Sequence, residues 1–415
     1  MADAVSHPPC RACSAPLTES FVDLGMSPIS NAMRRPDQAD RPEKFYPLRA
    51  FVCSECRLVQ LQDFCAADEL FDDTYTYFSS YAESWLRHAK AYAGMMIERF
   101  ALGANSRVIE VASNDGYLLQ YFKERGIPVL GIDPAANVAA VAEKERGIPT
   151  RVCFFGVETA KALRSEGIRA DVLAGNNVFA HVPDINDFAA GLKILLADNG
   201  VVTLEFPHLL RMIEANYFDT IYHEHYSYLS LLAVERLFKR HGLAVFDLEE
   251  LETHGGSLRL FVGHAEKARG ESDTLKTFRK RELDAGLASP QVYAAFADRV
   301  KRCKRELLKC LIGLKDQGKH VVAYGAPAKG NTLLNYCGIG RDIIDYAVDR
   351  SPHKQNMLLP GTGIAVHASE RIFETKPDYV LILPWNLKTE IMASMAGISE
   401  WGGRFIVPLP EAEIL

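Results

Sequence analysis

The segment 222–226 reads Tyr-His-Glu-His-Tyr and follows a predicted strand at 201–206. A run of polar and titratable side chains fits neither a core strand nor a helix with a buried face. The segment lacks the second histidine, four residues after the first, that a zinc protease needs. Catalytic residues gather in loops at the carboxyl end of a parallel sheet, and histidine titrates near neutral pH. The segment is therefore a candidate for catalytic residues, with a structural histidine as the alternative for each single histidine.

Other polar side chains follow other predicted strands. Asn176, Asn177 and His181 come after a strand at 171–175, and His254 stands in a late hairpin. Several such loops converge at the carboxyl edge of a parallel sheet. This favours His181, together with His225, as catalytic.

A nucleoside-like ligand is predicted from the region around residue 110. An apolar strand at 108–112 stops at the polar turn 113–116, and a helix-compatible segment follows at 117–125. A second strand, 129–133, ends in Asp133. Such a unit presents a ligand to a strand end and a helix start, and the acid is placed to bond a ribose diol.

Two cysteine knuckles predict a metal site. Cys10 and Cys13 are followed, after forty residues, by Cys53 and Cys56. Paired CxxC knuckles in a short, turn-rich stretch indicate four thiolates around a structural Zn²⁺. Unrelated buried cysteines and a redox pair are the alternatives, and the βαβ context that a redox pair needs is absent from the pattern.

The elements that must position these residues alternate between strand and helix, which predicts an α/β fold. Strands are expected at 107–112, 129–133, 171–175, 201–206, 244–250 and 257–262. Helices are expected at 81–100, 117–125, 136–146, 156–167, 185–197 and 231–241. The short connection between the last two strands suits an antiparallel edge on an otherwise parallel, doubly wound sheet.

The pattern restarts after an amphipathic helical stretch at 289–315. Strands at 320–324, 343–348 and 379–383 predict a second, smaller Rossmann-like domain, with helices at 332–337 and 387–395. Its first loop, 325–331, lacks GxGxxG, so it is a weak nucleotide signal. Lys329 in this loop is a candidate for a phosphate contact, with a solvated surface charge as the alternative.

Composition sets outer limits. A chain of 415 residues predicts two or three domains, and we expect the ranges 1–70, 71–265 and 266–415. The net charge of −6 argues against a nucleic-acid partner. No apolar run reaches the length of a membrane span. The nine cysteines, an odd number, favour a reduced, cytoplasmic protein. We expect the chain to be a monomer. Tyr75 and Tyr77 are candidates for a lid over the site, or for simple packing.

Together these motifs resemble the nucleotide-sugar C-methyltransferases that build branched deoxysugars, over essentially the whole chain and in the same order. The shared features are the paired knuckles, the E-x-[GA]-x-N-D-G loop at 110–116 and Y-x-E-H at 222–225. Y-G-A-x-A-K at 324–329 and N-x-C-G-I-G at 335–340 complete the set. Ala112 departs from generic methyltransferases, which have glycine there, so we expect a slightly shifted cofactor pose.

The resemblance implies a class I S-adenosylmethionine-dependent methyltransferase fold between a zinc module and a C-terminal sugar-nucleotide domain. It implies C-methylation, at carbon 3 with carbon 5 as the alternative, of a dTDP-linked 4-keto-deoxysugar through deprotonation beside the ketone. The implied catalytic residues are His225, Tyr222, Glu224 and His181. The implied cofactor residues are Glu110, Ala112, Asn114, Asp115, Gly116, Asp133, Pro134, Asn176 and Asn177. The implied substrate residues are Tyr75, Tyr77, His254, Lys329, Asn331, Asp349 and Asn386.

Three other functions remain open from the sequence. A small-molecule O- or N-methyltransferase would need no enolate chemistry. A zinc-knuckle binding protein with a degenerate methyltransferase domain is disfavoured by the intact Glu110, Asp115 and Asp133. A nucleotide-binding oxidoreductase is disfavoured because both loops lack GxGxxG.

Overall fold

The computed structural model describes residues 7–64, 78–267 and 269–415. The lid candidates Tyr75 and Tyr77 lie outside the described residues. The chain forms two compact units, and each is described by itself. The first runs to Leu17 and then takes up Cys53–His208 and Tyr226–Ala288; the second takes up Thr18–Val52, Leu209–His225 and Ser289–Leu415.

A seven-stranded sheet, counting the described residues, forms the centre of the first unit, in the order β10-β11-β8-β7-β4-β5-β6. Its strands are β4 (Val108–Val111), β5 (Val129–Asp133), β6 (Thr150–Val152), β7 (Ala170–Asn176), β8 (Leu196–Pro207), β10 (Leu243–Leu251) and β11 (Ser257–His264). β4 to β8 pair in parallel, whereas β11 is antiparallel to β8 and β10. The predicted sheet with an antiparallel edge is confirmed. The short strand β6 was missed because it carries a single apolar residue.

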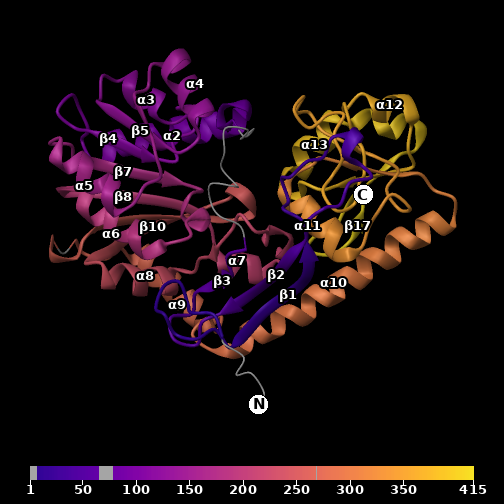
Figure 1. Cartoon of the computed structure of the whole chain (residues 1–415), viewed down its shortest axis with the longest axis horizontal. Coiled ribbons are helices and arrows are strands. Elements are labelled where there is room, and N and C mark those ends of the chain that lie inside the picture. The colour runs from indigo at the N-terminus through magenta and orange to yellow at the C-terminus, as the bar shows by residue number, and fades with distance from the viewer. Residues whose placement is uncertain (1–6, 65–77, 268) are drawn as a thin grey trace. The chain divides into compact units, whose positions relative to one another are not determined.

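Helices cover both faces of this sheet (Figure 1). They are α2 (Glu83–Arg99), α3 (Leu119–Lys123), α4 (Ala136–Arg146), α5 (Val157–Ser165), α6 (Ile185–Leu195), α8 (Leu231–Arg240) and α9 (Asp273–Asp284). One core joins α2 to α3, where the Tyr92 and Phe122 rings meet edge to face at 6.2 Å. The other joins α6 to α8 through Phe179, which stacks on both Phe188 and Phe238. The sheet is therefore doubly wound.

The cysteine knuckles also belong to the first unit. Directly after the second knuckle, β3 (Val59–Leu61) pairs antiparallel with β9 (Ser227–Tyr228). The knuckles are thus tied by backbone pairing to the unit that holds the seven-stranded sheet, rather than standing as a separate core.

A six-stranded sheet, again counting described residues, forms the core of the second unit, in the order β14-β13-β12-β15-β16-β17. Its strands are β12 (Val321–Tyr324), β13 (Ala347–Val348), β14 (Val366–His367), β15 (Tyr379–Ile382), β16 (Arg404–Val407) and β17 (Glu413–Ile414). All neighbours pair in parallel except β16 with β17. The order reverses between β12 and β15, which makes this the topological switch point of a Rossmann-like sheet.

The helices of the second unit are α7 (Leu209–Glu214), α10 (Pro290–Asp316), α11 (Ala328–Cys337), α12 (Arg371–Thr375) and α13 (Lys388–Ser394). The amphipathic stripe predicted for α10 is confirmed, with Phe296, Val300 and Leu307 buried. Two boundaries differ from the prediction. α11 begins at Ala328, so Lys329 lies in its first turn rather than in a loop. The strand expected at 343–348 is reduced to β13.

A hairpin of β1 (Glu19–Ser27) and β2 (Tyr46–Val52) belongs to the second unit, beside α10 (Figure 1). The Phe21 ring stacks on Phe296 of α10, with ring centroids 4.5 Å apart. The range 1–70 expected for the zinc module is therefore divided in space. Its knuckles join the first unit, and the hairpin between them packs its apolar face on α10.

Among the described helices, none is both long and apolar enough to cross a membrane.

Candidate active site

A cavity of about 530 Å³ opens in the first unit at the carboxyl ends of β4, β5 and β7. The predicted cofactor residues that line it are Ala112, Asn114, Asp133, Pro134, Asn176 and Asn177, and the predicted catalytic His181 lines it too. The predicted cofactor residues Glu110, Asp115 and Gly116 do not line it. The position matches a ligand crevice at the switch point of a doubly wound sheet, where β4 separates β5 from β7.

Asp133 organises the floor of the cavity. Its carboxylate accepts hydrogen bonds from the backbone amides of Asn114 and Ala135, both at 2.9 Å. Burial raises the pKa of Asp133, and the two amides act in the opposite direction. Each carboxylate oxygen can accept more than one hydrogen bond, so a ribose hydroxyl can still be bound.

Ala112 takes the conformation that the generic glycine would take. Its φ is 58° and that of Asn114 is 48°, both in the left-handed region. For a residue with a Cβ this conformation costs about 1 to 2 kcal/mol. Ala112 therefore occupies a backbone position that glycine would adopt without this cost.

Asp115 and Gly116 shape the loop from outside the cavity. The Asp115 carboxylate accepts hydrogen bonds from the amide and the hydroxyl of Ser80. Asn114 Oδ1 accepts from the Ser79 amide at 2.9 Å, and Ser79 itself lines the cavity. Gly116 has a φ of 78°, and a Cβ there would stand 3.0 Å from Ile148. These residues hold the segment before α2 against the loop, a long-range contact that sequence pattern alone did not indicate.

Glu110 lies fully buried on β4, below the cavity. Burial raises its pKa well above the usual value, and the hydroxyl of Tyr117 acts in the opposite direction. Tyr117 lines the cavity, and Asn176 Nδ2 donates to its hydroxyl at 3.4 Å. Both carboxylate oxygens of Glu110 have no hydrogen-bond partner within the described residues, so Glu110 is a buried acid on β4 that does not line the cavity itself.

The cavity has acceptors ready for a ligand. The buried side-chain oxygens of Asn176 and Asn177 have no hydrogen-bond partner within the described residues. Buried polar atoms are almost always satisfied, so these oxygens fit a ligand that brings donors. The amino group of S-adenosylmethionine is such a donor, and Asp133 suits its ribose. The residues present fit this cofactor.

Trp85, in the first turn of α2, also lines the cavity. Within the helix expected at 81–100, the helical period alone places Trp85 on the apolar face that packs on the core. Its ring stacks on Tyr117 at 5.9 Å and meets His254 edge to face at 5.4 Å. The predicted substrate residue His254 is thus placed beside the cofactor cavity, with Nε2 3.0 Å from Asn177 Nδ2. The helical period of apolar residues is the same for a tryptophan that lines a cavity and for one in the core, so sequence pattern could not distinguish the two roles.

The predicted catalytic pair Tyr222 and His225 lies in the second unit. His225 Nδ1 is 2.9 Å from the Thr220 carbonyl oxygen, and Nε2 is 2.8 Å from the Tyr222 hydroxyl. A carbonyl only accepts, so Nδ1 carries the proton in neutral His225. The Nε2 lone pair then accepts from the Tyr222 hydroxyl, which is the state a general base needs. His181 belongs to the first unit, so the predicted catalytic set is shared between the two units.

The loop that carries His225 is held within the second unit. Thr332 of α11 donates to the Ile221 carbonyl at 2.9 Å. The buried Asp219 accepts from the Trp385 indole at 2.7 Å, and Tyr217 stacks on the Trp385 ring at 3.9 Å. Predicted as a loop of the methyltransferase sheet, the segment instead packs with the C-terminal domain. This pairing over more than a hundred residues left no signal in local pattern.

Glu224 is buried and accepts from Asn31 Nδ2, which lies 2.8 Å from both carboxylate oxygens. Burial raises the pKa of Glu224 to about 7, against opposing effects of Asn31 and Lys354. The neighbouring His223 is buried and has Nε2 3.2 Å from the Pro47 carbonyl. Glu224 and His223 thus bind residues of the β1–β2 hairpin and the segment between its strands. These contacts position the loop that carries His225.

Glu224 makes the stability of the protein depend on pH. With a folded pKa of about 7 against an ordinary value of 4.5, the native state binds more protons between these limits, so stability falls as pH rises through this window. Between these two pKa values, we expect the free energy of unfolding of the wild type to fall by on the order of 3 kcal/mol, and we expect Glu224→Gln to abolish this fall. Urea unfolding at pH 5 and pH 8 measures it, with the exposed Glu214→Gln as control. An unchanged difference between the two pH values would contradict it.

Lys329 lies at the switch point of the second sheet. Its Nζ donates to Asn386 Oδ1 at 2.5 Å and stands 4.5 Å from the centre of the Trp385 ring. Burial lowers the pKa of Lys329 to about 8, and the charge of Asp219 opposes this shift. Burial in turn raises the pKa of Asp219 to about 6. The predicted substrate residues Lys329 and Asn386 are therefore brought together in a prebuilt polar cluster.

The predicted substrate residues Asp349 and Asn331 bind the protein's own backbone. Asp349 accepts from the amides of Ala326 at 2.7 Å and Ser351 at 2.8 Å. Asn331 is buried and donates to the Ser30 carbonyl at 2.6 Å. These contacts fix the loop before α11 and anchor the segment after β1.

The four knuckle cysteines form a metal centre in the first unit. Their Sγ atoms lie within 4.8 Å of one another, with Cys10 to Cys56 at 3.5 Å and Cys13 to Cys53 at 3.4 Å. Tetrahedral Zn–S bonds of about 2.3 Å place sulfurs about 3.8 Å apart, so the donor set fits zinc. Gln60 Nε2 donates to Cys10 Sγ at 3.1 Å, as a second-layer contact to a thiolate does. Four protein ligands leave no open position, so the zinc is structural.

Comparison with family models divides the chain into three parts. A zinc-binding domain model matches residues 10–71, a methyltransferase domain model matches residues 85–248, and a C-methyltransferase C-terminal domain model matches residues 252–410. The three matches follow one another along the chain in the order expected from the motifs.

A relative is similar over nearly the full length of both chains. The C-methyltransferase NovU from Streptomyces niveus is 35% identical over 406 residues, which are 98% of this chain and 96% of that protein.

Solved structures are similar over less than half of the chain. A SAM-dependent methyltransferase from Anabaena variabilis is 16% identical and covers 43% of this chain and 84% of its own, with a TM-score of 0.35. The magnesium protoporphyrin IX methyltransferase ChlM from Synechocystis, with bound SAH, is 12% identical over 43% and 82% of the two chains, with a TM-score of 0.35. The family models and the near-full-length relative, taken with the cavity and the cysteine site, show that the chain belongs to the zinc-binding, S-adenosylmethionine-dependent C-methyltransferases.

Proposed function

We propose that the chain methylates a carbon, carbon 3, of a dTDP-linked 4-keto-deoxysugar. The Tyr222–His225–Thr220 hydrogen-bond chain carries this proposal, because the Thr220 carbonyl holds a proton on Nδ1 and leaves Nε2, which meets the Tyr222 hydroxyl, as the nitrogen that takes up a proton. The nature of the substrate follows from the resemblance of the motifs to enzymes of branched deoxysugar biosynthesis.

A C-methyltransferase needs a carbon nucleophile, and a C–H bond beside a ketone provides one. Removal of that proton leaves a charge that spreads onto the ketone oxygen as an enolate. S-adenosylmethionine supplies the electrophilic methyl group when bound. His225 Nε2 takes the proton, and the Thr220 carbonyl keeps the resulting imidazolium oriented through Nδ1–H.

The enolate oxygen needs hydrogen-bond donors, and Tyr222 and His181 are our candidates. The Tyr222 hydroxyl meets His225 Nε2, and once Nε2 carries the substrate's proton it can no longer accept from that hydroxyl, whose proton can then turn toward the enolate oxygen. Glu224, held by Asn31, orients the loop from behind.

The diphosphate of the sugar nucleotide suits the switch point of the C-terminal sheet. Lys329 stands in the first turn of the ten-residue helix α11, where a helix amino end favours anions. Asn386 and the Trp385 ring hold its ammonium group in place. An arriving phosphate would replace Asn386 as the partner of this ammonium group, and we propose the C-terminal domain as the nucleotide-binding part.

The described cysteines other than the knuckles are free thiols, which fits a reducing compartment, and we propose the cytoplasm.

Incubation with S-adenosylmethionine and a panel of 4-keto sugar nucleotides tests the proposal. We expect one member of the panel to gain the mass of one methylene unit, with the new methyl group on carbon by NMR. A methyl group on oxygen or nitrogen would instead support a small-molecule O- or N-methyltransferase, which needs no base at carbon.

A further inference from the structure

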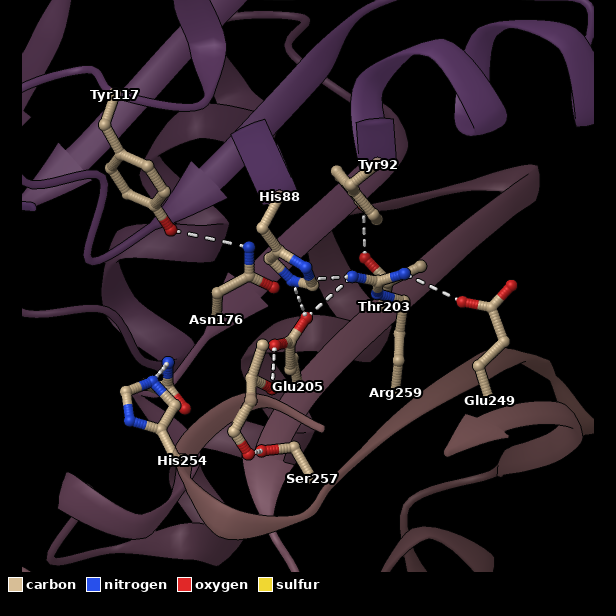
Figure 2. Close-up of polar contacts among 12 residues, drawn as sticks. His88, Tyr92, Tyr117, Asn176, Thr203, Glu205, Glu249, His254, Ser257 and Arg259 are labelled. Carbon is tan, nitrogen blue, oxygen red and sulfur yellow. Dashed lines mark hydrogen bonds and ion pairs between the residues drawn. The ribbon is translucent and has the colours of Figure 1, made fainter. Parts of the chain in front are cut away.

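Glu205, on β8, is a fully buried carboxylate that lies outside the cofactor cavity. Its carboxylate has polar contacts with three different elements, and His88 Nε2 also lies 3.0 Å from Arg259 Nη2. Oε2 lies 2.7 Å from Arg259 Nη2 on β11 and 2.9 Å from His88 Nε2 on α2, and Oε1 accepts from Thr253 Oγ1 at 3.0 Å (Figure 2). A buried charge with this many partners is costly to disturb.

The contact between Glu205 and His88 reaches the cavity through α2. His88 lies one helical turn after Trp85, and their rings stack with centroids 4.9 Å apart. Trp85 lines the cavity. Because Glu205 fixes the edge of the His88 ring, it also fixes the plane against which the Trp85 indole rests.

The contact between Glu205 and Thr253 reaches the cavity through the turn Thr253–Gly255. Thr253 is bound to Glu205, and the next residue, His254, has a φ of 54°. Its Nε2 meets Asn177 Nδ2 at 3.0 Å, and Asn177 lines the cavity. The backbone N–H of Asn177 in turn donates to the backbone carbonyl of Glu205 at 2.8 Å. A left-handed histidine persists only where its surroundings hold it, and the Thr253 bond is part of that hold.

The remaining contacts of the network lead away from the cavity. Arg259 Nη1 binds Glu249 at 2.7 Å, and its guanidinium lies 4.6 Å from the centre of the Tyr92 ring. The Tyr92 hydroxyl meets Thr203 Oγ1 at 2.6 Å (Figure 2). Burial raises the pKa of Glu205, but His88 and Arg259 outweigh burial and lower it, so the carboxylate stays ionised.

We propose that Glu205 is a positioning residue for the cofactor: through His88 it sets Trp85, and through Thr253 and His254 it sets Asn177, and both Trp85 and Asn177 line the cavity. Glu205 touches no reacting atom. Its effect is on the affinity for cofactor and product, and it is independent of which carbon is methylated.

Titration calorimetry of the full-length, zinc-loaded protein with S-adenosylhomocysteine tests this. Glu205→Gln leaves Arg259 short of a counter-charge and risks misfolding, so the main variant is Thr253→Val, which removes one bond to Glu205 and keeps the side-chain volume. We expect the Kd to rise roughly 5- to 10-fold, which corresponds to the net contribution of one ordinary hydrogen bond. Thr253→Ser, which keeps the hydroxyl, is expected to bind within about 2-fold of wild type.

Thr203→Val is the matched control, because it makes the same change in the same network on the side that leads away from the cavity. It leaves the buried Tyr92 hydroxyl without its Thr203 bond, so it is expected to lower the melting temperature at least as much as Thr253→Val, with Kd unchanged. Two results would overturn the proposal: wild-type affinity in Thr253→Val, or an equal loss of affinity in Thr203→Val. Failure of Thr253→Ser to restore binding would do so as well.

Discussion

Replacement of His225 by alanine is expected to lower the rate of methyl transfer by about 10²- to 10⁴-fold, which is the usual contribution of a positioned general base. The reason is geometric. His225 presents Nε2 as a lone pair because the Thr220 carbonyl holds the proton on Nδ1. Affinity for S-adenosylmethionine is expected to stay within about 3-fold of wild type, since the residues that line the cavity come from elements of the first unit. Single-turnover methyl transfer and calorimetry measure the two quantities separately.

Two further variants make the assignment specific. His225→Asn keeps a donor for the Thr220 carbonyl but has no basic nitrogen, so its rate should fall as far as that of the alanine variant. His320→Ala removes a largely exposed histidine from the same unit and should leave the rate unchanged. Normal turnover in His225→Asn would remove His225 from the role of base.

Removal of zinc is expected to unfold the polypeptide around the cysteine knuckles. Zinc binding to a four-thiolate site is worth on the order of 10 kcal/mol of folding free energy, and the knuckle segments 7–17 and 53–64 have little core of their own. Without the metal, four thiol groups within 4.8 Å of one another also crowd each other. We expect chelation to expose these segments to protease first, and Cys53→Ser to lower the melting temperature in the same way.

The cofactor should still bind to the chelated protein, with some loss of affinity. Arg11 of the first knuckle donates to the carbonyl of Pro183, a cavity residue, and Asn186 donates to the Arg11 carbonyl at 2.7 Å. The thiol control is Cys310→Ser, on α10, away from the knuckles. An unchanged proteolysis pattern with full activity after verified zinc loss would contradict a structural role for the metal.

The elements with strong periodicity could be predicted from the sequence. α4 occupies the predicted range 136–146, and α10 lies within one residue of its predicted range. Asp133 and Ala112 were placed at the cavity because a strand end followed by a turn fixes their position by itself. The convergence of the four cysteines could be predicted because the CxxC spacing is typical of tetrahedral zinc sites on many different folds.

The rest depended on contacts between distant residues. Nothing local to Asp115 indicates that it binds Ser80 instead of facing the cavity. Nothing local to the segment Leu209–His225 indicates that Thr332 and Trp385 draw it into the second unit. Trp85 reads as core by its helical position and yet lines the cavity, because the partners that turn its ring outward, His88 and Tyr117, come together only in the fold.

Solvent exchange at the sugar carbon tests the central claim most directly. The wild-type enzyme, the His225→Ala variant and the 4-keto sugar nucleotide identified from the panel are placed in D₂O with S-adenosylhomocysteine, so that no methyl group can be transferred. NMR follows the hydrogen beside the ketone. We predict that wild type replaces this hydrogen by deuterium and that His225→Ala does so at least about 10²-fold more slowly. Equal exchange by both proteins, at a rate sufficient for turnover, would contradict deprotonation by His225.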